Sequence, residues 1–465
     1  MERNELKGKK VSVIGAGRSG IAAALLLSRK GAEPFLSDHA GISEEELDGL
    51  RSQGIPFEQG GHSPRVHDAD LCIVSPGVPL NVPVVRTMEE RGVPVYSEVE
   101  LASWFCTARI IAITGTDGKT TTTTLIHRIC ETDGRAAGYR AYAVGNIGVP
   151  FSSKVLEMAP ADVAVLELSS YQLERSETFR PDIAVMTNIT PDHLDRYGGD
   201  IQNYARAKFR IYANQESWDT LVYNHDDPFL RQHFSDERVC PSRLVPFGIH
   251  LDPEKTNGSV FLEDGLIMSS VGGSRKEVAG IDEIMKRSFR GDHNLSNALA
   301  SSAAAVAAGI APSAIREALL DFRGVEHRQE FAGNAGGLEW INDSKATNLN
   351  AMRQALLATP GQVVLIAGGR DKGNDYRLIT DLVLTKVTCI IAIGESKMNI
   401  AKAFDGIVSV RTAGSLAEAV SLARSIGSTG QSVLFSPGCA SFDMFTNYEE
   451  RGKLFKQLVR ELDSC

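Results

Sequence analysis

The sequence predicts an α/β protein made of three consecutive domains with parallel sheets. Short apolar runs of strand length alternate with helical segments along most of the chain, and many of the strands end in turns rich in glycine or polar residues. A chain of 465 residues is also too long for one ordinary hydrophobic core. Because parallel sheets bind ligands at the carboxyl ends of their strands, we expect the functional residues in these turns.

The composition is that of a globular protein. Hydrophobic residues make up 43% of the chain and charged residues 23%, and no run approaches the ~18 apolar residues needed to cross a bilayer. The first ten residues are rich in charged side chains and lead directly into a strand, so the sequence indicates no secretory signal. We therefore expect a cytoplasmic protein without a membrane partner.

Charge and cysteine content exclude two further classes of protein. There are 49 basic and 58 acidic residues, for a net charge of −9, and no dense basic run that could follow a nucleic-acid backbone. The seven cysteines are scattered and never form a Cys-x-x-Cys pair. They indicate reduced thiols rather than a disulfide framework or a zinc site.

The first predicted domain, residues 1–97, opens with a βαβ unit. A strand at 10–14 enters the glycine turn Gly15–Gly20, and the next strand ends at Asp38. A later strand breaks at Ser75–Gly77, at the ligand-binding end of such a sheet. By itself the glycine turn is compatible with a dinucleotide, with another diphosphate ligand, or with close packing alone.

The second predicted domain, residues 98–324, contains the most informative motif. An apolar strand at 109–114 enters a turn bracketed by two glycines, and a helix then opens with a lysine and a row of threonines. Glycines allow backbone N–H groups to approach an anion closely. Such glycines, a helix N-terminus and a lysine together are typical of a phosphate site. The loop is shorter than the common P-loop, because Ile113 stands where that pattern has glycine. We predict ATP as the ligand, and the predicted contacts are Gly115, Thr116, Asp117, Gly118, Lys119, Thr120 and Thr121.

Three further residues of this domain are candidates for metal binding or catalysis. Glu167 lies late in an apolar strand, where a carboxylate is costly unless it is paired or bound to metal. Together with Thr120 it predicts a Mg²⁺ site. His193 follows the next strand, on the ligand side of the sheet. On its residue type alone, Lys208 would be interpreted as a solvated helix lysine.

The remainder of the chain completes the pattern. Residues 218–290 are irregular, with one hairpin expected around Asp264 and Gly265 and no chemistry predicted. The third predicted domain, residues 325–465, repeats the alternation of strands and helices. Polar turns follow three of its strands, at 343–348, 368–372 and 436–441.

In the order of its motifs the chain resembles the Mur ligases, the ATP-dependent amide-forming enzymes of peptidoglycan precursor synthesis. The resemblance runs nearly end to end and rests on residues 166–174, 192–197 and 342–348, which are most similar to the member that adds D-glutamate to UDP-N-acetylmuramoyl-L-alanine. It implies a Rossmann-like N-terminal domain for the UDP-sugar, a central P-loop-type domain for ATP, and a C-terminal Rossmann-like domain for the amino acid.

The resemblance also implies roles for individual residues. The UDP-sugar contacts would be Gly15, Gly17, Arg18, Ser19, Asp38, His39, Ser75, Gly77 and Asn146. The remaining ATP contacts would be Asn294, Asn297, Arg328 and Asp343. The D-glutamate contacts would be Thr347, Lys372, Ser441, Phe442 and Tyr448, the last at a position where the family usually has phenylalanine. The catalytic residues would be Lys119, His193, Lys208 and Lys345.

The family mechanism implies two Mg²⁺ ions and an acyl-phosphate intermediate. Thr120 and Glu167 would hold one ion, and His193 would reach the second together with Lys208, which CO₂ would convert to a carbamate. ADP and phosphate would be released. We expect a monomer whose third domain closes onto the second about a hinge at residues 321–325.

Three other interpretations remain. A nicotinamide-dependent dehydrogenase would use the first glycine turn but would leave the Lys119 loop unexplained. A non-catalytic nucleotide-binding regulator has no need of Glu167, His193 and Lys208. The nearest alternative is another ligase of the same family, including a folylpolyglutamate type, that uses a different acceptor or amino acid.

Overall fold

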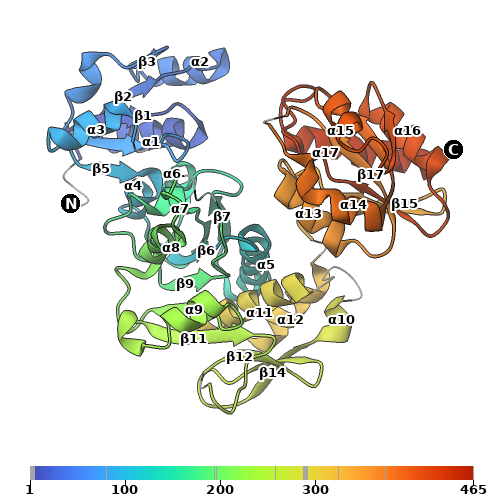
Figure 1. Ribbon diagram of the computed structural model, residues 1–465. Coiled ribbons are helices and arrows are strands. Elements are labelled where there is room, and N and C mark those ends of the chain that lie inside the picture. Colours follow the sequence, from blue (N-terminus) through green and yellow to red (C-terminus); the bar gives the residue numbers. More distant parts are fainter. Residues whose placement is uncertain are drawn as a thin grey trace. The chain divides into compact units, whose positions relative to one another are not determined.

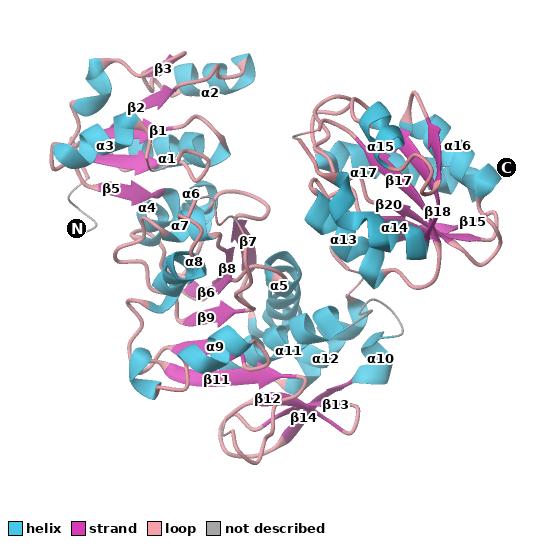
Figure 2. Ribbon diagram, viewed as in Figure 1, coloured by secondary structure: helices cyan, strands magenta, loops and turns pink. Residues whose placement is uncertain are grey.

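The computed structural model describes residues 6–79, 81–192, 194, 196–256, 258–285, 292–322, 324–371 and 373–463. These residues form an α/β protein with three sheets (Figures 1 and 2), which confirms the predicted fold class. Contacts divide the chain into two compact units, Met1–Phe322 and Arg323–Cys465. The first unit contains two of the sheets and the second contains one. The predicted boundaries at residues 97 and 324 stay predictions.

The amino-terminal sheet has five parallel strands in the order β3-β2-β1-β4-β5. The strands are β1 (Lys10–Ile14), β2 (Glu33–Asp38), β3 (Phe57–Gln59), β4 (Leu71–Val74) and β5 (Val95–Ser97). The connecting helices are α1 (Arg18–Arg29), α2 (Glu44–Ser52), the 3-10 helix η1 (Pro64–His67) and α3 (Pro83–Glu90). The chain changes direction across the sheet between β1 and β4, which is where sheets of this kind bind ligands.

The central sheet has nine strands in the order β14-β13-β12-β11-β10-β9-β6-β8-β7. Its strands are β6 (Arg109–Thr114), β7 (Ala141–Gly145), β8 (Val163–Glu167), β9 (Ile183–Met186), β10 (Thr220–Asn224), β11 (Arg243–Gly248), β12 (Val260–Glu263), β13 (Leu266–Ser269) and β14 (Lys276–Gly280). All neighbouring pairs from β7 to β12 are parallel, and β12, β13 and β14 are antiparallel.

The helices of this region include α5, which begins directly after the loop that follows β6. They are α4 (Glu98–Ser103), α5 (Lys119–Ala137), α6 (Phe151–Lys154), α7 (Ser170–Leu173), α8 (Ile201–Phe209), α9 (Pro228–His233), α10 (Ile281–Met285), α11 (Asp292–Ala307) and α12 (Pro312–Asp321). Helix α5 packs against both α11 and α12 (Figure 1). Short 3-10 helices lie at Val155–Glu157, Arg210–Tyr212 and Glu237–Val239.

The region that the sequence left irregular is an extension of the central sheet. The hairpin predicted around Asp264 and Gly265 is confirmed, since β12 and β13 pair across these two residues and both have positive φ. However, β10 and β11 continue the parallel sheet before it. Proline and glycine in the short run of β11 obscured a strand whose last four residues are buried.

The carboxy-terminal sheet has six strands in the order β15-β16-β20-β17-β18-β19. They are β15 (Glu330–Ala335), β16 (Leu338–Asn342), β17 (Val363–Gly368), β18 (Val387–Ile393), β19 (Ser409–Thr412) and β20 (Ser432–Phe435). The helices are α13 (Leu349–Ala358), the 3-10 helix η5 (Tyr376–Ile379), α14 (Thr380–Lys386), α15 (Lys397–Ala403), α16 (Leu416–Ile426) and α17 (Tyr448–Asp463). The apolar runs at 338–342, 363–367, 388–393 and 432–435, which the sequence indicates as strands, form the middle of this sheet as β16, β17, β18 and β20.

Two general expectations can be compared with the described residues. Among them, no helix combines the length and the apolar character that a bilayer crossing requires. The six cysteines in the described part of the chain are buried free thiols, as the scattered spacing predicted.

Candidate functional site

The loop between β6 and α5 has the backbone conformation that an anion-binding turn needs. Gly115 and Gly118 have φ of +149° and +80°, values that residues with a Cβ atom rarely adopt. Gly118 is the N-cap of α5, so the helix begins at Lys119 and its first N–H groups lie at the loop. The helix dipole adds partial positive charge at the same place.

The segment that follows β9 braces this loop. The Thr116 N–H donates to the backbone oxygen of Asn188 (3.0 Å), and the Asp117 N–H donates to the Asn188 Oδ1 (2.8 Å). The Thr187 hydroxyl donates to the Asp117 carbonyl (2.6 Å). A Cβ added at Gly115 would collide with the Thr187 side chain, so a glycine is required there for space as well as conformation.

Lys119 lies at the loop that it was predicted to serve. Its Nζ donates to the backbone oxygens of Gly115 (2.9 Å) and Thr116 (2.6 Å), and the side chain is half-buried. The ammonium group is therefore held within reach of an anion bound by the loop. Thr120 and Thr121 are buried in the first turn of α5.

The two asparagines of α11 lie near the start of α5. Asn297 is buried, and its Oδ1 accepts a hydrogen bond from the Thr122 hydroxyl at 3.2 Å. A Cβ at Gly118 would collide with the Asn297 side chain, so this residue lies directly behind the loop. Asn294 is half-buried one turn earlier. The tertiary fold thus connects residues 118 and 297, which are distant in sequence.

Glu167 ends β8 beside β6 and is 2% exposed. One carboxylate oxygen, Oε1, accepts a hydrogen bond from the Asn146 amide at 2.7 Å. The other, Oε2, is buried without a hydrogen-bond partner among the described residues. A buried carboxylate oxygen with nothing to bind is costly, so the residue fits an oxygen ligand of Mg²⁺.

No group of three or more His, Cys, Asp or Glu side chains with metal-ligand spacing occurs among the residues that the structure describes. A Mg²⁺ ion at Glu167 would therefore be completed by hydroxyl, phosphate or water oxygens, as is usual for this ion. The predicted ligand His193 lies outside the described residues.

Lys208 is buried, in contrast to the solvated position that its residue type suggested. The side chain is 1% exposed on α8, and its Nζ donates to the Gly115 carbonyl at 2.7 Å. The Nζ also lies 4.5 Å from the centre of the Tyr204 ring. Burial, together with the positive charge of Lys119, holds the pKa of Lys208 well below its ordinary value.

The first glycine turn is stabilised by the residues that end β2 and β4. Gly15 has φ of +94°, and its carbonyl accepts a hydrogen bond from the buried Ser75 hydroxyl (3.1 Å). Asp38 accepts from the N–H groups of Ala16 and Ala40. Both side chains therefore shape the crevice at the carboxyl ends of the strands. Gly17, Arg18, His39 and Gly77 are exposed there, and Ser19 is half-buried.

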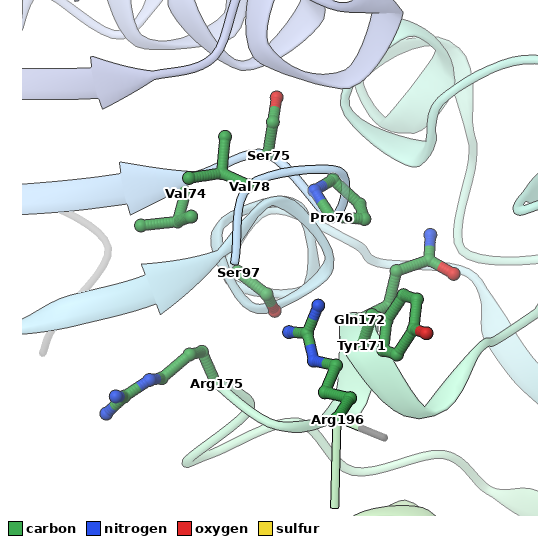
Figure 3. A pocket seen from close by; sticks show the side chains of 9 residues that line it. All are labelled: Val74, Ser75, Pro76, Val78, Ser97, Tyr171, Gln172, Arg175 and Arg196. Carbon is green, nitrogen blue, oxygen red and sulfur yellow. The ribbon is translucent and has the colours of Figure 1, made fainter. Parts of the chain in front are cut away.

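A small pocket lies where the ends of β4 and β5 meet α7 (Figure 3). Ser75 and Pro76 line one side, and Arg175 and Arg196 line another. Arg196 stacks on the Tyr171 ring, with 3.9 Å between the guanidinium carbon and the ring centre. The pocket thus joins the predicted UDP-sugar turn to the central region of the same unit. The full lining is Val74, Ser75, Pro76, Val78, Ser97, Tyr171, Gln172, Arg175 and Arg196.

In the carboxy-terminal unit, the turn after β16 carries the predicted nucleotide contact Asp343. This carboxylate is 5% exposed and accepts hydrogen bonds from the Ser436 hydroxyl (2.8 Å) and the Gln329 N–H (3.2 Å). Burial raises the pKa of Asp343 to about 7, although Ser436, Gln329 and the nearby Arg328 oppose the shift. Arg328 precedes β15 in the sequence, whereas Asp343 follows β16. The half-buried side chain of Arg328 is nevertheless close enough for its positive charge to act on this carboxylate.

The other predicted residues of this unit lie around the same strand ends. Lys345 is half-buried, and its N–H donates to the His327 carbonyl at 3.0 Å. The Tyr448 carbonyl accepts from the Ser344 hydroxyl at 2.8 Å. Among the predicted D-glutamate contacts, Thr347 and Tyr448 are half-buried, Ser441 is buried and Phe442 is exposed, while Lys372 lies outside the described residues.

Sequence reasoning missed Arg451, which ties two of these turns together. Its guanidinium donates to the Ser344 hydroxyl (3.0 Å) and carbonyl (2.7 Å) and to the Cys439 carbonyl (3.2 Å), and the residue is 1% exposed. Burial lowers the pKa of Arg451 to about 10, so it remains charged at neutral pH. The available signal was its spacing, because positions 451, 455 and 459 share one helix face with the buried Phe455 and Val459.

Comparison with known proteins identifies three consecutive family domains in this chain. The MurD N-terminal domain matches residues 10–83, the Mur ligase middle domain matches 113–305, and the Mur ligase glutamate ligase domain matches 327–439. The chain belongs to the Mur ligase family. The resemblance inferred from the motifs is therefore confirmed.

Individual relatives are similar over their whole lengths. The UDP-N-acetylmuramoylalanine–D-glutamate ligase of Chlorobaculum tepidum is 61% identical, with 99% of this chain and 100% of the relative covered. The ligase of the same name from Chlorobaculum parvum is 59% identical, with 100% of both chains covered. Among solved structures, MurF from Acinetobacter baumannii has a TM-score of 0.59 at 19% identity and covers 96% of this chain and 93% of its own, which supports the fold alone.

Each matched domain contains some of the predicted site residues, while Ser441, Phe442 and Tyr448 lie beyond the end of the third match. The glycine turn at Gly15 lies in the first match, the phosphate loop and Glu167 in the second, and Asp343 with Lys345 in the third. These comparisons establish that the chain belongs to the Mur ligase family. The roles of individual residues stay predictions.

Proposed function

We propose that this Mur ligase forms an amide bond between UDP-N-acetylmuramoyl-L-alanine and D-glutamate, converting ATP to ADP and phosphate in peptidoglycan precursor synthesis. The names of relatives up to 61% identical over the full length support this proposal. The structural observation that supports it is the convergence of Lys119 and Lys208 on the backbone oxygen of Gly115, in a loop whose backbone conformation suits an anion.

The first step joins two anions. An oxygen of the alanyl carboxylate attacks the γ-phosphorus of ATP, and the bond from that phosphorus to the ADP oxygen breaks. Lys119 and the N–H groups at the start of α5 would hold the phosphates and offset the charge that opposes the attack. Lys345, from the carboxy-terminal unit, would contact the phosphoryl group during transfer.

The second step uses D-glutamate as the nucleophile. Its neutral amine attacks the carbonyl carbon of the acyl phosphate, the carbon–oxygen bond to phosphate breaks, and the nitrogen loses a proton. Thr347 and Lys372 would bind one carboxylate of the amino acid, and Ser441 with the backbone at Phe442 would bind the other. Tyr448 would pack beside it. Two carboxylates held at fixed positions would orient the amine toward the acyl carbon.

Glu167 and Thr120 would hold a Mg²⁺ ion, which when bound neutralises phosphate charge. Two features of Lys208 support its proposed modification. Its amine is sealed beside the loop, and its lowered pKa makes the neutral form available. Neutral amine and CO₂ form a nitrogen–carbon bond with loss of a proton, and the carbamate oxygens would then serve a second Mg²⁺ together with His193.

The remaining assignments complete the proposal. The N-terminal domain would hold the UDP group around the Gly15 turn, Asp38 and Ser75, with Asn146 reaching the sugar. Asn294, Asn297, Arg328 and Asp343 would contact ATP. We also propose that the enzyme acts as a cytoplasmic monomer.

A phosphate-release assay tests the proposal. The purified chain is given ATP, Mg²⁺ and UDP-N-acetylmuramoyl-L-alanine, with D-glutamate, L-glutamate, L-lysine or meso-diaminopimelate supplied separately. We expect release only with D-glutamate. Equal release with another of these amino acids would contradict the assigned specificity, and no release with any of them would contradict the reaction.

A further inference from the structure

A cluster of three polar side chains lies at the carboxyl ends of β2 and β3. Ser37 is fully buried at the end of β2, next to Asp38. Its hydroxyl donates to Glu58 Oε1 at 2.6 Å and lies 2.7 Å from His62 Nδ1. The same Glu58 oxygen also accepts from the Ser63 N–H at 3.0 Å. None of these three side chains belongs to the site described above.

The hydrogen bonds determine which nitrogen of His62 carries the proton. Burial would raise the pKa of Glu58, but the hydrogen bonds from Ser37 and Ser63 hold it below its ordinary value, so the side chain is an acceptor only. The single hydroxyl proton of Ser37 is directed to that carboxylate, and the His62 Nδ1 must therefore donate to the Ser37 oxygen. In the neutral ring Nε2 is then left as an acceptor.

The neutral state of His62 follows from its surroundings. Burial lowers the pKa of His62, and the adjacent His39 acts in the same direction, whereas Glu58 and Asp38 oppose the shift. The His62 Nε2 has no hydrogen-bond partner in the described part of the chain, and it is not sealed from solvent. The fold thus presents one accessible acceptor of defined tautomer.

This acceptor lies next to residues that the proposed function assigns to the UDP group. The Gly60 N–H donates to the Ala40 carbonyl (3.1 Å), and the Gly61 N–H donates to the Asp38 carbonyl (3.3 Å). These bonds hold the loop that carries His62 against the end of β2. The ring centres of His39 and His62 are 6.2 Å apart.

We propose that His62 determines the base specificity of the nucleotide-sugar site, with its Nε2 accepting a hydrogen bond from N3–H of uracil. Uracil carries a proton on N3, whereas the N3 of cytosine is an acceptor and would face the His62 lone pair. The Ser37–Glu58 pair acts as a positioning element that keeps the proton on Nδ1. This inference rests on the proposed binding of UDP by the N-terminal domain.

Calorimetric binding of UDP and CDP to the full chain tests the proposal. Wild type binds UDP more tightly than CDP. In His62→Phe, which keeps a ring and removes the acceptor, UDP binding weakens by about two- to tenfold while CDP binding is not weakened. His62→Gln offers a carbonyl oxygen and retains part of the preference. Ser37→Ala leaves His62 in place but removes the hydrogen bond that keeps the proton on Nδ1. This variant therefore also lowers the preference for UDP over CDP.

His250→Phe, an exposed histidine in the loop after β11, is the matched control and leaves the UDP-to-CDP ratio unchanged. Thermal unfolding of each variant verifies that it is folded. Equal weakening of UDP and CDP in His62→Phe would show that the residue only supports the loop, and it would overturn the proposal. Failure of wild type to bind UDP would instead contradict the nucleotide site of the proposed function.

Discussion

At the scale of single residues, the informative feature is the presence of charged groups in places where burial is costly. Glu167, Lys208 and Asp343 are each at most 5% exposed. Such groups are rarely retained for stability alone, because an apolar residue of similar size would avoid the cost of removing a charge from water. Their positions around the predicted phosphate and nucleotide contacts support the proposal that they serve binding or catalysis.

Replacing Glu167 by Gln removes the negative charge but keeps an oxygen that can accept the Asn146 hydrogen bond. Because Oε2 has no partner to lose, we expect the melting temperature to be unchanged or higher. We expect phosphate release to fall by at least ~100-fold, as loss of several kcal/mol of charge stabilisation predicts. Assays over a range of Mg²⁺ concentrations, paired with thermal unfolding, measure both effects. A Glu167→Gln variant with full activity would show that Glu167 is not a Mg²⁺ ligand.

Lys208→Ala tests the proposed carbamate. We expect the variant to be inactive and to regain part of its activity when acetate or another short carboxylate is added, because the added anion can occupy the space of the missing carbamate. The readout is phosphate release with and without the carboxylate. Wild type under the same additions serves as the control, and an inactive variant that no short carboxylate restores would count against the modification.

Asp343 makes the stability of the carboxy-terminal unit depend on pH. Its folded-state pKa is raised to about 7 from 3.8, so ionising it in the folded protein is unfavourable. The stability contribution is complete below about pH 4 and is lost as pH rises through about 7. We expect Asp343→Asn to be more stable than wild type at pH 8, by up to about 4 kcal/mol, with a smaller difference at pH 5.5. Urea unfolding at the two pH values measures this, and a constant difference would contradict the shift.

At the scale of elements, the β6–α5 loop is determined by two glycines and by its contacts to neighbouring segments. Gly118 begins α5 and Gly138 ends it, and both have φ near +80°. They differ in their surroundings, because a Cβ at Gly118 would meet Asn297 whereas nothing lies within 4 Å of one at Gly138. The two positions therefore separate backbone strain from steric collision.

Gly138→Ala is expected to lower the free energy of unfolding by about 1 kcal/mol, the cost of a left-handed alanine, and to leave nucleotide binding intact. Gly118→Ala adds the collision with Asn297, and we expect a loss of about 2–3 kcal/mol together with weaker ATP binding. Denaturant unfolding and nucleotide titration provide the two measurements. If both variants bind ATP equally well, the loop does not hold the phosphates.

At the scale of the whole molecule, the predicted ATP contacts are divided between two units. Asn294 and Asn297 belong to the first unit, and Arg328 and Asp343 belong to the second, which begins at Arg323. A chain that must bring both sets to one nucleotide needs a flexible connection, and the predicted hinge at residues 321–325 includes the junction between the units.

Small-angle scattering measures the expected closure. We expect the radius of gyration to fall when a non-hydrolysable ATP analogue, Mg²⁺ and UDP-N-acetylmuramoyl-L-alanine are added together. Gly118→Ala, which is expected to bind nucleotide weakly, should show a smaller change under the same conditions. Scattering that does not respond to the complete mixture would argue against a hinged closure.

The sequence by itself determined the α/β class, the glycine-bracketed turn between β6 and α5 and the family, because these depend on local signals: apolar strands, glycines at turns, and ordered motifs. The edge strands β15 and β19 were missed, since an edge position permits glycines and polar residues that conceal a strand. On its residue type alone Lys208 would be a solvated helix lysine, and only the packing of α8 shows that it is buried beside Gly115.

The tertiary structure alone decided which distant residues meet. It places Asn297 behind Gly118, Arg451 between two turns, and His62 beside Ser37. No local pattern encodes these contacts, because they join segments far apart in the chain. Burial is a property of the packed fold, and it shifts the pKa values of Lys208, Asp343 and His62. The protonation of these groups therefore depends on the tertiary structure and cannot be inferred from the sequence.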